Sequence, residues 1–460
     1  MRKIGTLLVI ATLLALCLYS VAVAQSWERV VDNGFGEPGN DYAWGMATFQ
    51  GKLYVGTLNP VKGAEIWRSA SGEPDTWERV YNARSGVFSN GGIRCLYPDG
   101  EDALYACAAN MRGAEILRTT NGKRWTTVSR AGAGSRKNYT VRCMVRFKDN
   151  LYGGSGVQGA HLCRSKNGFN WRTVQTTPSF ESTKVLDPNT NTMITNNILI
   201  GELAVFHDQL YAFTWDKDYT PQVMLDQIKA GPDAPVVFPE PPGAFEVFRS
   251  SDGVQWEKVV GQDDIYNNGM GFCLRDPAGL DNDVITSTTV FNDRLYLGTE
   301  NSSGKTSIWR TDNGTAWEKV LDFPEDYGER YNFYIWRMIP FHDKLYVGTL
   351  NQGIVGTPGV TGAQIWVSET GERHSFRKIV NNGFDGESFV AYEGMVMPKN
   401  YGIRNFGILS SRVSPTGPTR ETLFAGTATV ISVPVPRYKP GDKAHIVGSD
   451  IGCEIWKMIE

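Results

Sequence analysis

Short apolar segments alternate with tight polar turns along most of this chain, in an order that recurs at intervals of roughly 45 to 85 residues. The fullest copy runs Phe49-Gln-Gly-Lys-Leu-Tyr-Val-Gly-Thr57, then Gly63-Ala-Glu-Ile-Trp-Arg-Ser69, then Trp77-Glu-Arg-Val80. Apolar side chains at alternate positions predict β-strands. Because only short polar turns separate these strands, each copy predicts a small antiparallel sheet in which sequence neighbours pair.

A Leu-Tyr pair, or its equivalent, marks the second strand of each copy. Its aromatic member occurs seven times, as Tyr54, Tyr105, Tyr152, Tyr211, Tyr296, Tyr346 and Phe424. A third strand follows each pair, as in Glu65-Ile-Trp-Arg68 and Glu454-Ile-Trp-Lys457. Repeats of this kind are typical of β-propellers, in which four-stranded blades surround an axis. The sequence therefore predicts an all-β fold, a single seven-bladed β-propeller of four-stranded antiparallel blades.

The link between the third and fourth strands carries the sharpest turn signal. A tryptophan follows the glycine by three residues in each of Asn121-Gly122, Asn167-Gly168, Asp252-Gly253 and Asn313-Gly314. Asn-Gly and Asp-Gly tolerate the positive φ angles of a type I′ turn, so we expect that turn here. We expect the tryptophans to begin the fourth strands and to fill the gaps between blades, in preference to stacking on carbohydrate.

The last copy lacks a fourth strand, because the sequence given reaches Glu460 shortly after its third strand. A matching segment lies near the start, where Trp27-Glu-Arg-Val-Val31 resembles Trp77-Glu-Arg-Val80. We expect strand 27–31 to pair with strand 454–459 and to close the ring without an open sheet edge. This closure predicts one domain, from residue 25 to residue 460.

Residues 1–24 have the pattern of a secretory signal peptide. Arg2-Lys3 precede an apolar run from Leu7 to Leu18, and Ala22-Val-Ala24 forms a small-residue cleavage site. A retained membrane anchor is the alternative, since the apolar run nearly reaches spanning length. We expect cleavage, with residues 25–460 secreted, periplasmic or on the cell surface as a monomer, without membrane insertion.

Charge and cysteine content restrict the function classes. The net charge of −3 leaves no basic field to hold nucleic acid. The cysteines beyond the signal segment show no C-x-x-C and no zinc spacing with histidine, but their even number permits disulfides in an exported chain. Cys95 and Cys107 flank the turn 98–102 and form the favoured pair. Asp281 and Asp283 are weak calcium candidates, and no other cofactor is expected.

Charged and aromatic residues occupy the openings of the first strands. Aligned on the phenylalanine before the first turn, these positions are Trp44, Arg94, Arg142, Glu202, Thr286-Ser287, Trp336-Arg337 and Glu393. The first strands of a propeller converge on its axis, so we expect the three arginines to meet at the channel mouth, balanced by the glutamates. One explanation is a belt of salt bridges between blades, because buried charges need partners. The other is a pocket that grips a carboxylate, sulfate or phosphate.

Two known repeat types resemble these motifs. Arg249-Ser-Ser-Asp-Gly-Val-Gln-Trp256 and its sister turns resemble the Asp-box, or BNR, repeats of sialidase-type propellers. The Phe-x-x-x-Leu-Tyr-x-Gly hairpins are similar to those of kelch-type propellers. Sialidase-type propellers hold a substrate carboxylate with three arginines, so the resemblance implies that role for Arg94, Arg142 and Arg337.

Long insertions are expected mainly on one face of the disc. They are 178–199, 216–243, 262–283, 351–361 and 431–449, with 398–421 expected on the other face as the first turn of the last blade. Elaborated loops on a rigid scaffold usually carry binding residues. We therefore expect an exported binding protein that recognises a glycan, an anionic small molecule or a protein partner. The alternatives are a sialidase-like glycoside hydrolase or lyase that acts on an acidic sugar through Glu202 or Glu393, and a passive surface scaffold.

Overall fold

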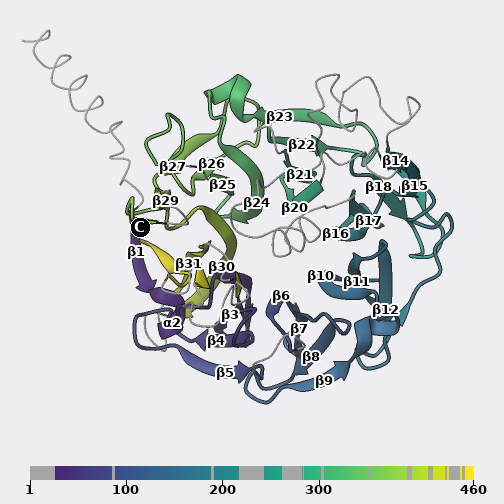
Figure 1. Cartoon of the computed structure of the whole chain (residues 1–460), viewed down its shortest axis with the longest axis horizontal. Helices are drawn as coiled ribbons and strands as arrows, with labels where there is room; N and C mark the ends of the chain where they lie inside the picture. The colour runs from purple at the N-terminus through teal and green to yellow at the C-terminus, as the bar shows by residue number, and fades with distance from the viewer. Residues whose placement is uncertain are drawn as a thin grey trace, which may run out of the picture.

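The structure is a computed structural model, shown in Figure 1. It describes residues 26–84, 89–187, 191–216, 243–261, 282, 284–301, 305–351, 353, 355–390, 396–412, 418–429, 433–434, 446–447 and 451–459. Three of the candidate residues, Asp281, Asp283 and Glu393, lie outside this part of the chain. Within the described residues, no helix is both long enough and apolar enough to cross a membrane.

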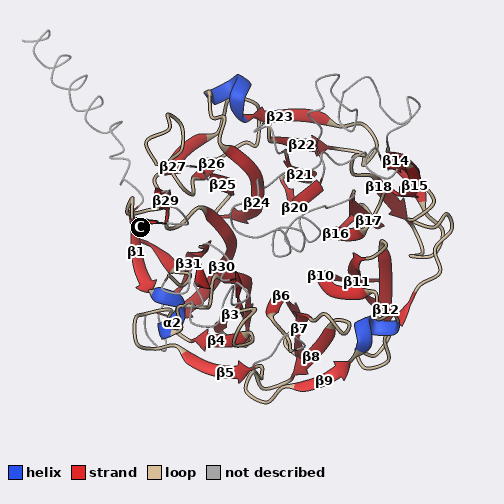
Figure 2. Cartoon of the chain, in the orientation of Figure 1, coloured by secondary structure: helices blue, strands red, loops and turns tan. Residues whose placement is uncertain are grey.

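The fold is all-β, with a few short helical turns (Figure 2). Consecutive strands pair antiparallel in groups of four. The first three groups are β2 (Tyr42–Phe49), β3 (Lys52–Leu58), β4 (Glu65–Ser69) and β5 (Glu78–Asn82); β6 (Gly92–Asp99), β7 (Ala103–Ala109), β8 (Glu115–Thr119) and β9 (Thr126–Ser129); and β10 (Asn138–Phe147), β11 (Asn150–Val157), β12 (His161–Ser165) and β13 (Arg172–Thr173).

The later groups follow the same order. They are β16 (Leu199–Phe206), β17 (Gln209–Trp215), β18 (Val247–Ser250) and β19 (Glu257–Val260); β20 (Val284–Phe291), β21 (Arg294–Glu300), β22 (Ser307–Thr311) and β23 (Glu318–Asp322); β24 (Asn332–Phe341), β25 (Lys344–Asn351), β26 (Ile365–Ser368) and β27 (Arg377–Val380); and β30 (Gly402–Arg412), β31 (Thr419–Ala428), β34 (Ile455–Ile459) and β1 (Ser26–Val31).

The remaining elements lie in the links. They are the hairpins β14 (Lys184–Asp187) with β15 (Thr192–Thr195), β28 (Ser388–Val390) with β29 (Val396–Pro398), and β32 (Val433–Pro434) with β33 (Ile446–Val447), and the turns α2 (Asn33–Gly36), η1 (Ala131–Gly134) and η2 (Phe323–Tyr327).

The groups follow one another around a common centre, in a propeller-like arrangement. Figure 1 shows β6, β10, β16, β20 and β24 near the centre and β5, β9 and β23 at the rim. Each innermost strand contacts the innermost strands of the groups before and after it, including β2 with β30. The innermost strands therefore bring residues that are far apart in the sequence to the middle of the molecule.

The N-terminal strand pairs with the last strand of the chain. The register places Trp27 opposite Met458 and Glu28 opposite Lys457. The end of β1 also packs into a cluster with residues of β2 and β3, since Val30, Met46 and Val55 share one apolar core. The pairing expected from the sequence is thus present.

Aromatic residues at the start of the fourth strands pack between neighbouring groups, as predicted. Trp317, 2% exposed, lies in a core with Phe213 of the preceding group and Leu297 of its own. Trp256 packs in the same way with Tyr152 and Phe248. These tryptophans are therefore structural.

The predicted turn type is found at a different link. Type I′ needs positive φ at both central residues, and that pattern occurs in first-to-second-strand turns such as His342-Asp343, with φ of 45° and 57°. In the Asn121-Gly122 turn only the glycine has positive φ. Asn121 Oδ1 accepts hydrogen bonds from the backbone N–H groups of Lys123 and Arg124. A Cβ at Gly122 would lie 1.8 Å from the Tyr54 hydroxyl oxygen, so glycine lets the tyrosine of the preceding group approach.

Two further expectations need correction. Segment 398–421 was expected to be a turn, but it contains the whole of β30, the innermost strand of the last group. Cys95 and Cys107 lie opposite each other on β6 and β7, as predicted, yet both thiols are free in the structure. The register was predictable from the turn between them, whereas the disulfide is absent from this pair.

Candidate functional site

A β-bulge recurs at the same level of every innermost strand. Each bulge follows a fully buried Ile, Val or Ala, and its extra residue lies outside the ladder. The bulge residues are Trp44, Arg94, Arg142, Gly201, Thr286, Trp336 and Arg404. A bulge redirects a side chain and bends its strand. These positions can therefore hold large or charged side chains, whereas a regular strand would place apolar side chains into the core here.

Three bulge arginines stack on tryptophans of the preceding or following group. The guanidinium carbon of Arg94 lies 4.8 Å from the centre of the Trp44 ring, and that of Arg404 lies 4.8 Å from the Trp336 ring. Such contacts fix the plane of a guanidinium group and partly offset its loss of water. Trp44 and Trp336, which the sequence analysis placed among the candidate strand openings, therefore each hold an arginine of the next group through a ring contact.

Arg142 stacks on a tryptophan that the alignment of first strands did not reveal. Its guanidinium carbon lies 3.6 Å from the centre of the Trp215 ring on β17. Trp215 occupies the space beside the one bulge residue without a side chain, because a Cβ at Gly201 would lie 2.3 Å from Trp215 Nε1. The indole nitrogen donates a hydrogen bond to the Ile285 carbonyl at 2.7 Å, which fixes the ring.

A central pocket of about 270 Å³ lies among the innermost strands. Arg94, Arg142, Arg337 and Glu202 all line it, so the structure brings together four of the five charged residues that the sequence singled out. Arg337 Nη1 donates to Glu202 Oε1 at 3.3 Å. Glu202 is the only carboxylate among the described residues that line this pocket.

The electrostatics of the site are dominated by positive charge. Burial raises the pKa of Glu202 above its usual value, although Arg337, Arg142 and Arg404 act in the opposite direction. Burial together with repulsion from Arg337 and Arg142 lowers the pKa of Arg404 to about 9. Arg94, Arg142 and Arg337 thus line the pocket with one carboxylate among the described residues, and Arg404 lies close enough to Arg337 and Arg142 to be repelled by them.

Two buried tyrosines lie next to this group and remain uncharged at neutral pH. The hydroxyl groups of Tyr42 and Tyr401 share a hydrogen bond, and Tyr42 packs edge-on against Trp336. Burial raises the pKa of Tyr42 to about 12 and that of Tyr401 well above its usual value. The tyrosines therefore supply no negative charge to the arginines.

Arg404 was missed by the sequence reasoning. The last innermost strand was placed too early in the chain, and Glu393 was assigned to its opening in place of Arg404. The signal was present, because Ile403-Arg404 repeats the apolar-arginine step of Ile93-Arg94 and Val141-Arg142. Arg404 is 2% exposed, and its Nε has no hydrogen-bond partner among the described residues.

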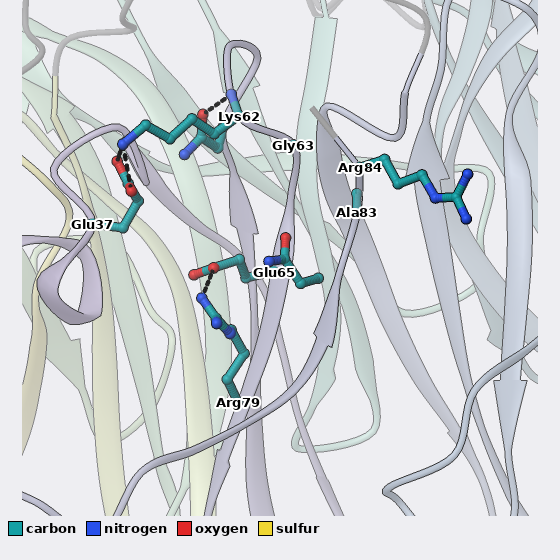
Figure 3. Close-up of a pocket in the computed structure, with 9 residues that line it drawn as sticks. Glu37, Lys62, Gly63, Glu65, Arg79, Ala83 and Arg84 are labelled. Carbon is teal, nitrogen blue, oxygen red and sulfur yellow. Dashed lines mark hydrogen bonds and ion pairs between the residues drawn. The ribbon is translucent and has the colours of Figure 1, made fainter. Parts of the chain in front are cut away.

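A second cavity, of about 710 Å³, is larger and is lined by three basic and two acidic residues (Figure 3). Two ion pairs form in this cavity, since Lys62 Nζ lies 2.7 Å from Glu37 Oε2 and Arg79 Nη1 lies 2.5 Å from Glu65 Oε1. The Arg84 side chain points away from these pairs in Figure 3. Both acids of this cavity are therefore paired, and its excess of basic over acidic residues is smaller than that of the central pocket.

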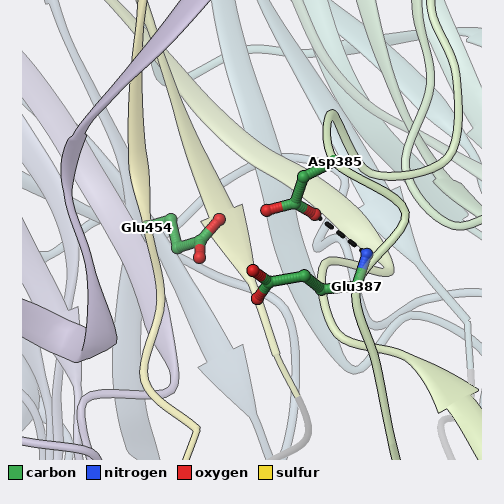
Figure 4. Close-up of side chains that lie close together, drawn as sticks. All are labelled: Asp385, Glu387 and Glu454. Carbon is green, nitrogen blue, oxygen red and sulfur yellow. Dashed lines mark hydrogen bonds between the residues drawn. The ribbon is translucent and has the colours of Figure 1, made fainter.

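Three carboxylates gather beside the N-terminal strand, from Asp385, Glu387 and Glu454 (Figure 4). Their oxygens lie close enough together to hold a metal ion. Arg29 Nη1 already contacts all three, at 3.2, 3.4 and 2.9 Å, respectively. The cluster is accordingly an ion-pair network of the protein itself.

Comparison with known proteins finds solved structures of similar fold but no protein family to which the chain can be assigned. No protein family and no curated protein match the sequence. Among solved structures, an ulvan lyase of polysaccharide lyase family PL25 matches with a TM-score of 0.49 at 11% identity, over 94% of this chain and 95% of that chain. Saccharomyces cerevisiae Sqt1 matches with a TM-score of 0.41 at 9% identity, over 94% and 97%.

A glycosidase matches more weakly. The α-L-arabinofuranosidase CtGH43 from Clostridium thermocellum has a TM-score of 0.31 at 12% identity, over 74% of this chain and 93% of that chain. At these identities and scores, similarity assigns no activity to this chain. The Asp-box and kelch resemblances remain predictions from the sequence.

Proposed function

We propose that this chain is an exported seven-bladed β-propeller that binds a small anionic ligand in its central pocket. The observation that carries the proposal is the surplus of guanidinium groups over carboxylates at the bulge level. Buried charges of one sign are unfavourable unless something balances them. A bound carboxylate, sulfate or phosphate supplies that balance through charge-assisted hydrogen bonds.

A salt-bridge belt accounts less well for the same residues. A belt needs a carboxylate for each arginine, whereas Glu202 is the one carboxylate among the described residues that line the pocket. The passive scaffold that the sequence left open predicts no charged concavity. The central pocket therefore favours binding over both of these interpretations.

The proposed ring rests on the pairing of its two ends. Strand β1 completes the last group through β34, and Phe424 of β31 reaches the turn glycine of the first group, where a Cβ at Gly72 would lie 2.3 Å from its ring. The same contact joins Tyr54 to Gly122 in the first two groups. We propose that this contact repeats across the seam and closes seven blades into one domain, residues 25–460.

Anion binding is tested by isothermal titration at constant ionic strength. Sodium sulfate, sodium benzoate and sodium glucuronate should each be titrated into the wild type and into Arg142→Ala. We expect the variant to lose about 2–5 kcal/mol of binding free energy, the cost of removing one partner of a desolvated charge pair. If no anion binds the wild type, the proposed function is wrong.

The chain provides a matched control on the same strand. Arg146 lies four residues after Arg142 but is bound to Asp99, with Nε donating to Oδ1 at 2.7 Å. Arg146→Ala therefore removes the same charge outside the pocket. It should leave anion affinity unchanged, whereas equal losses in both variants would show that net charge alone attracts the anion.

A second candidate function is a hydrolase or lyase that acts on an acidic sugar, with Glu202 as acid or base. The raised pKa of Glu202 favours this role, because a higher pKa brings a carboxyl group closer to the range in which it can act as a general acid or base. Paired-carboxylate hydrolysis needs a second carboxyl group roughly 5 to 9.5 Å away. The described lining residues do not contain one, which argues against paired-carboxylate hydrolysis but not against elimination by a lyase. Turnover of acidic polysaccharides by the wild type, lost in Glu202→Gln, would favour this function over binding alone.

A further inference from the structure

We infer that the anion bound in the central pocket is a small carboxylic acid with a compact apolar body, such as an aromatic or branched-chain acid. This inference rests on the proposed anion-binding function and narrows its ligand class. It distinguishes such acids from sugar acids and from inorganic anions, all of which carry the negative charge that the arginines require.

The first support is an apolar layer directly beside the charged one. The residue two positions after each bulge residue lies on the same side of its strand, since side chains alternate along a strand. At six of the seven strands this residue is apolar and lines the pocket: Met46, Leu96, Met144, Leu203, Met338 and Phe406. A ligand held at the bulge level by its carboxylate therefore places its remaining atoms against methionine, leucine and phenylalanine.

The second support is that the neutral polar side chains Asn405 and Tyr97, which also line the pocket, already make hydrogen bonds within the protein. Asn405 lines the pocket, but its Nδ2 donates to the Trp44 carbonyl at 3.0 Å and its Oδ1 accepts from the Phe406 N–H at 3.0 Å. The Tyr97 hydroxyl accepts from the Arg146 N–H at 2.9 Å. Sugar hydroxyls buried here would lose their hydrogen bonds to water and find few replacements, which weakens binding.

The third support is size. The pocket holds about 270 Å³, slightly below the range of roughly 300–1,000 Å³ that is usual for drug-sized ligands. It matches one small ring or a short branched chain and its carboxylate. Methionine side chains adapt their shape and make favourable sulfur contacts with aromatic rings, so Met46, Met144 and Met338 suit a flat apolar body.

Titration of three sodium salts at constant ionic strength and pH 7 tests the inference. We expect benzoate to bind at least tenfold more tightly than glucuronate or sulfate. Glucuronate or sulfate binding as tightly as benzoate overturns the inference and leaves the proposed anion site standing. Absence of binding by all three overturns the inference and the proposed function together.

Variants of the apolar layer separate packing from charge. Met144→Gln and Met338→Gln keep the side-chain length but place an amide against the ligand, and each should lower benzoate affinity roughly tenfold, the order of effect of a changed apolar contact. Both should leave sulfate affinity within twofold, which shows that the variants fold and retain the arginines. Met111, which is 62% exposed, provides the control Met111→Gln with unchanged affinities. Equal losses for benzoate and sulfate in the two pocket variants contradict the inference.

Discussion

Buried charge is handled differently at the seam between the chain ends and at the centre of the molecule. At the seam, the carboxylate of Glu454 is fully buried and accepts from Arg29 at 2.9 Å, Lys399 at 2.6 Å, Asn400 at 2.6 Å and Trp456 at 2.8 Å. At the centre, several guanidinium groups share one carboxylate. The buried acid at the seam is thus matched by its bases, whereas among the described residues that line the central pocket the arginines outnumber the carboxylates.

The comparison separates two uses of the same chemistry. Ion pairing at the seam joins β1 to the link that precedes β30, and it raises the pKa of Lys399 through hydrogen bonds to Glu387 and Glu454 that outweigh burial. At the centre, burial and like charges lower the pKa of Arg404. A base whose pKa rises is stabilised by its partners, and one whose pKa falls is destabilised by its surroundings. The two regions therefore differ in the direction of the shift, since the pKa of Lys399 is raised and that of Arg404 is lowered.

Removal of the N-terminal strand should have the largest effect. A chain that starts at Asn33 loses the buried Val30 and Val31 and exposes the edge of β34, so we expect a loss of more than about 4 kcal/mol of unfolding free energy and aggregation. A chain that starts at Gln25 is the control. Equal melting temperatures for the two chains would show that β1 does not hold the seam.

Neutralising the buried seam carboxylate should have the next largest effect. Glu454→Gln leaves Lys399 and Arg29 without their buried partner, and we expect about 3 kcal/mol of destabilisation in urea unfolding. The control Glu257→Gln breaks the exposed pair with Arg249 and should unfold like the wild type. Equal stability of the two variants would mean that solvent, and not ion pairing, satisfies the seam.

The tyrosine pair beside the arginines gives a pH-dependent test. A raised pKa means that the folded state keeps a proton that the unfolded state loses, so stability is complete below pH 10 and falls as the pH rises towards 12. We expect a slope of about 1.4 kcal/mol per pH unit for each such tyrosine. The double variant Tyr42→Phe/Tyr401→Phe should reduce this alkaline loss in urea unfolding between pH 10 and 12. An unchanged slope would show that the tyrosines ionise freely and can balance the arginines.

Much of the fold was predictable because each repeat can be recognised from short stretches of sequence. Alternating apolar residues, tight turns and the displaced strand 27–31 each depend on neighbours in the sequence. The turn type was misassigned because Asn-Gly supports two geometries, and the Tyr54 hydroxyl beside Gly122 selects one through a contact between groups. That contact is not visible in the turn sequence.

The site was predictable only where the strand register was clear. Arg142, Arg337 and Glu202 precede phenylalanine-marked turns, Arg94 precedes the turn after Asp99, and the structure places all four around one pocket. Arg404 lies on a strand whose equivalent position is Leu409, so alignment on phenylalanine failed there. The Trp215 ring occupies the space that a side chain at position 201 would take. Trp215 lies on the second strand of its group, so an alignment of innermost strands cannot reveal it.

The smallest expected effect tests the central claim most directly. Arg404→Met keeps an unbranched chain against Trp336 and removes one charge, and its unfolding free energy should be measured in urea with and without sodium benzoate. Without benzoate, we expect the variant to equal or exceed the wild type by about 1 kcal/mol, because like-charge repulsion is relieved. With benzoate at about 100 times its dissociation constant, the wild type should gain about 2.7 kcal/mol and the variant less, so that their order reverses. If Arg404→Met is instead destabilised as strongly as Glu454→Gln and benzoate changes neither protein, the central arginines are structural and the account is wrong.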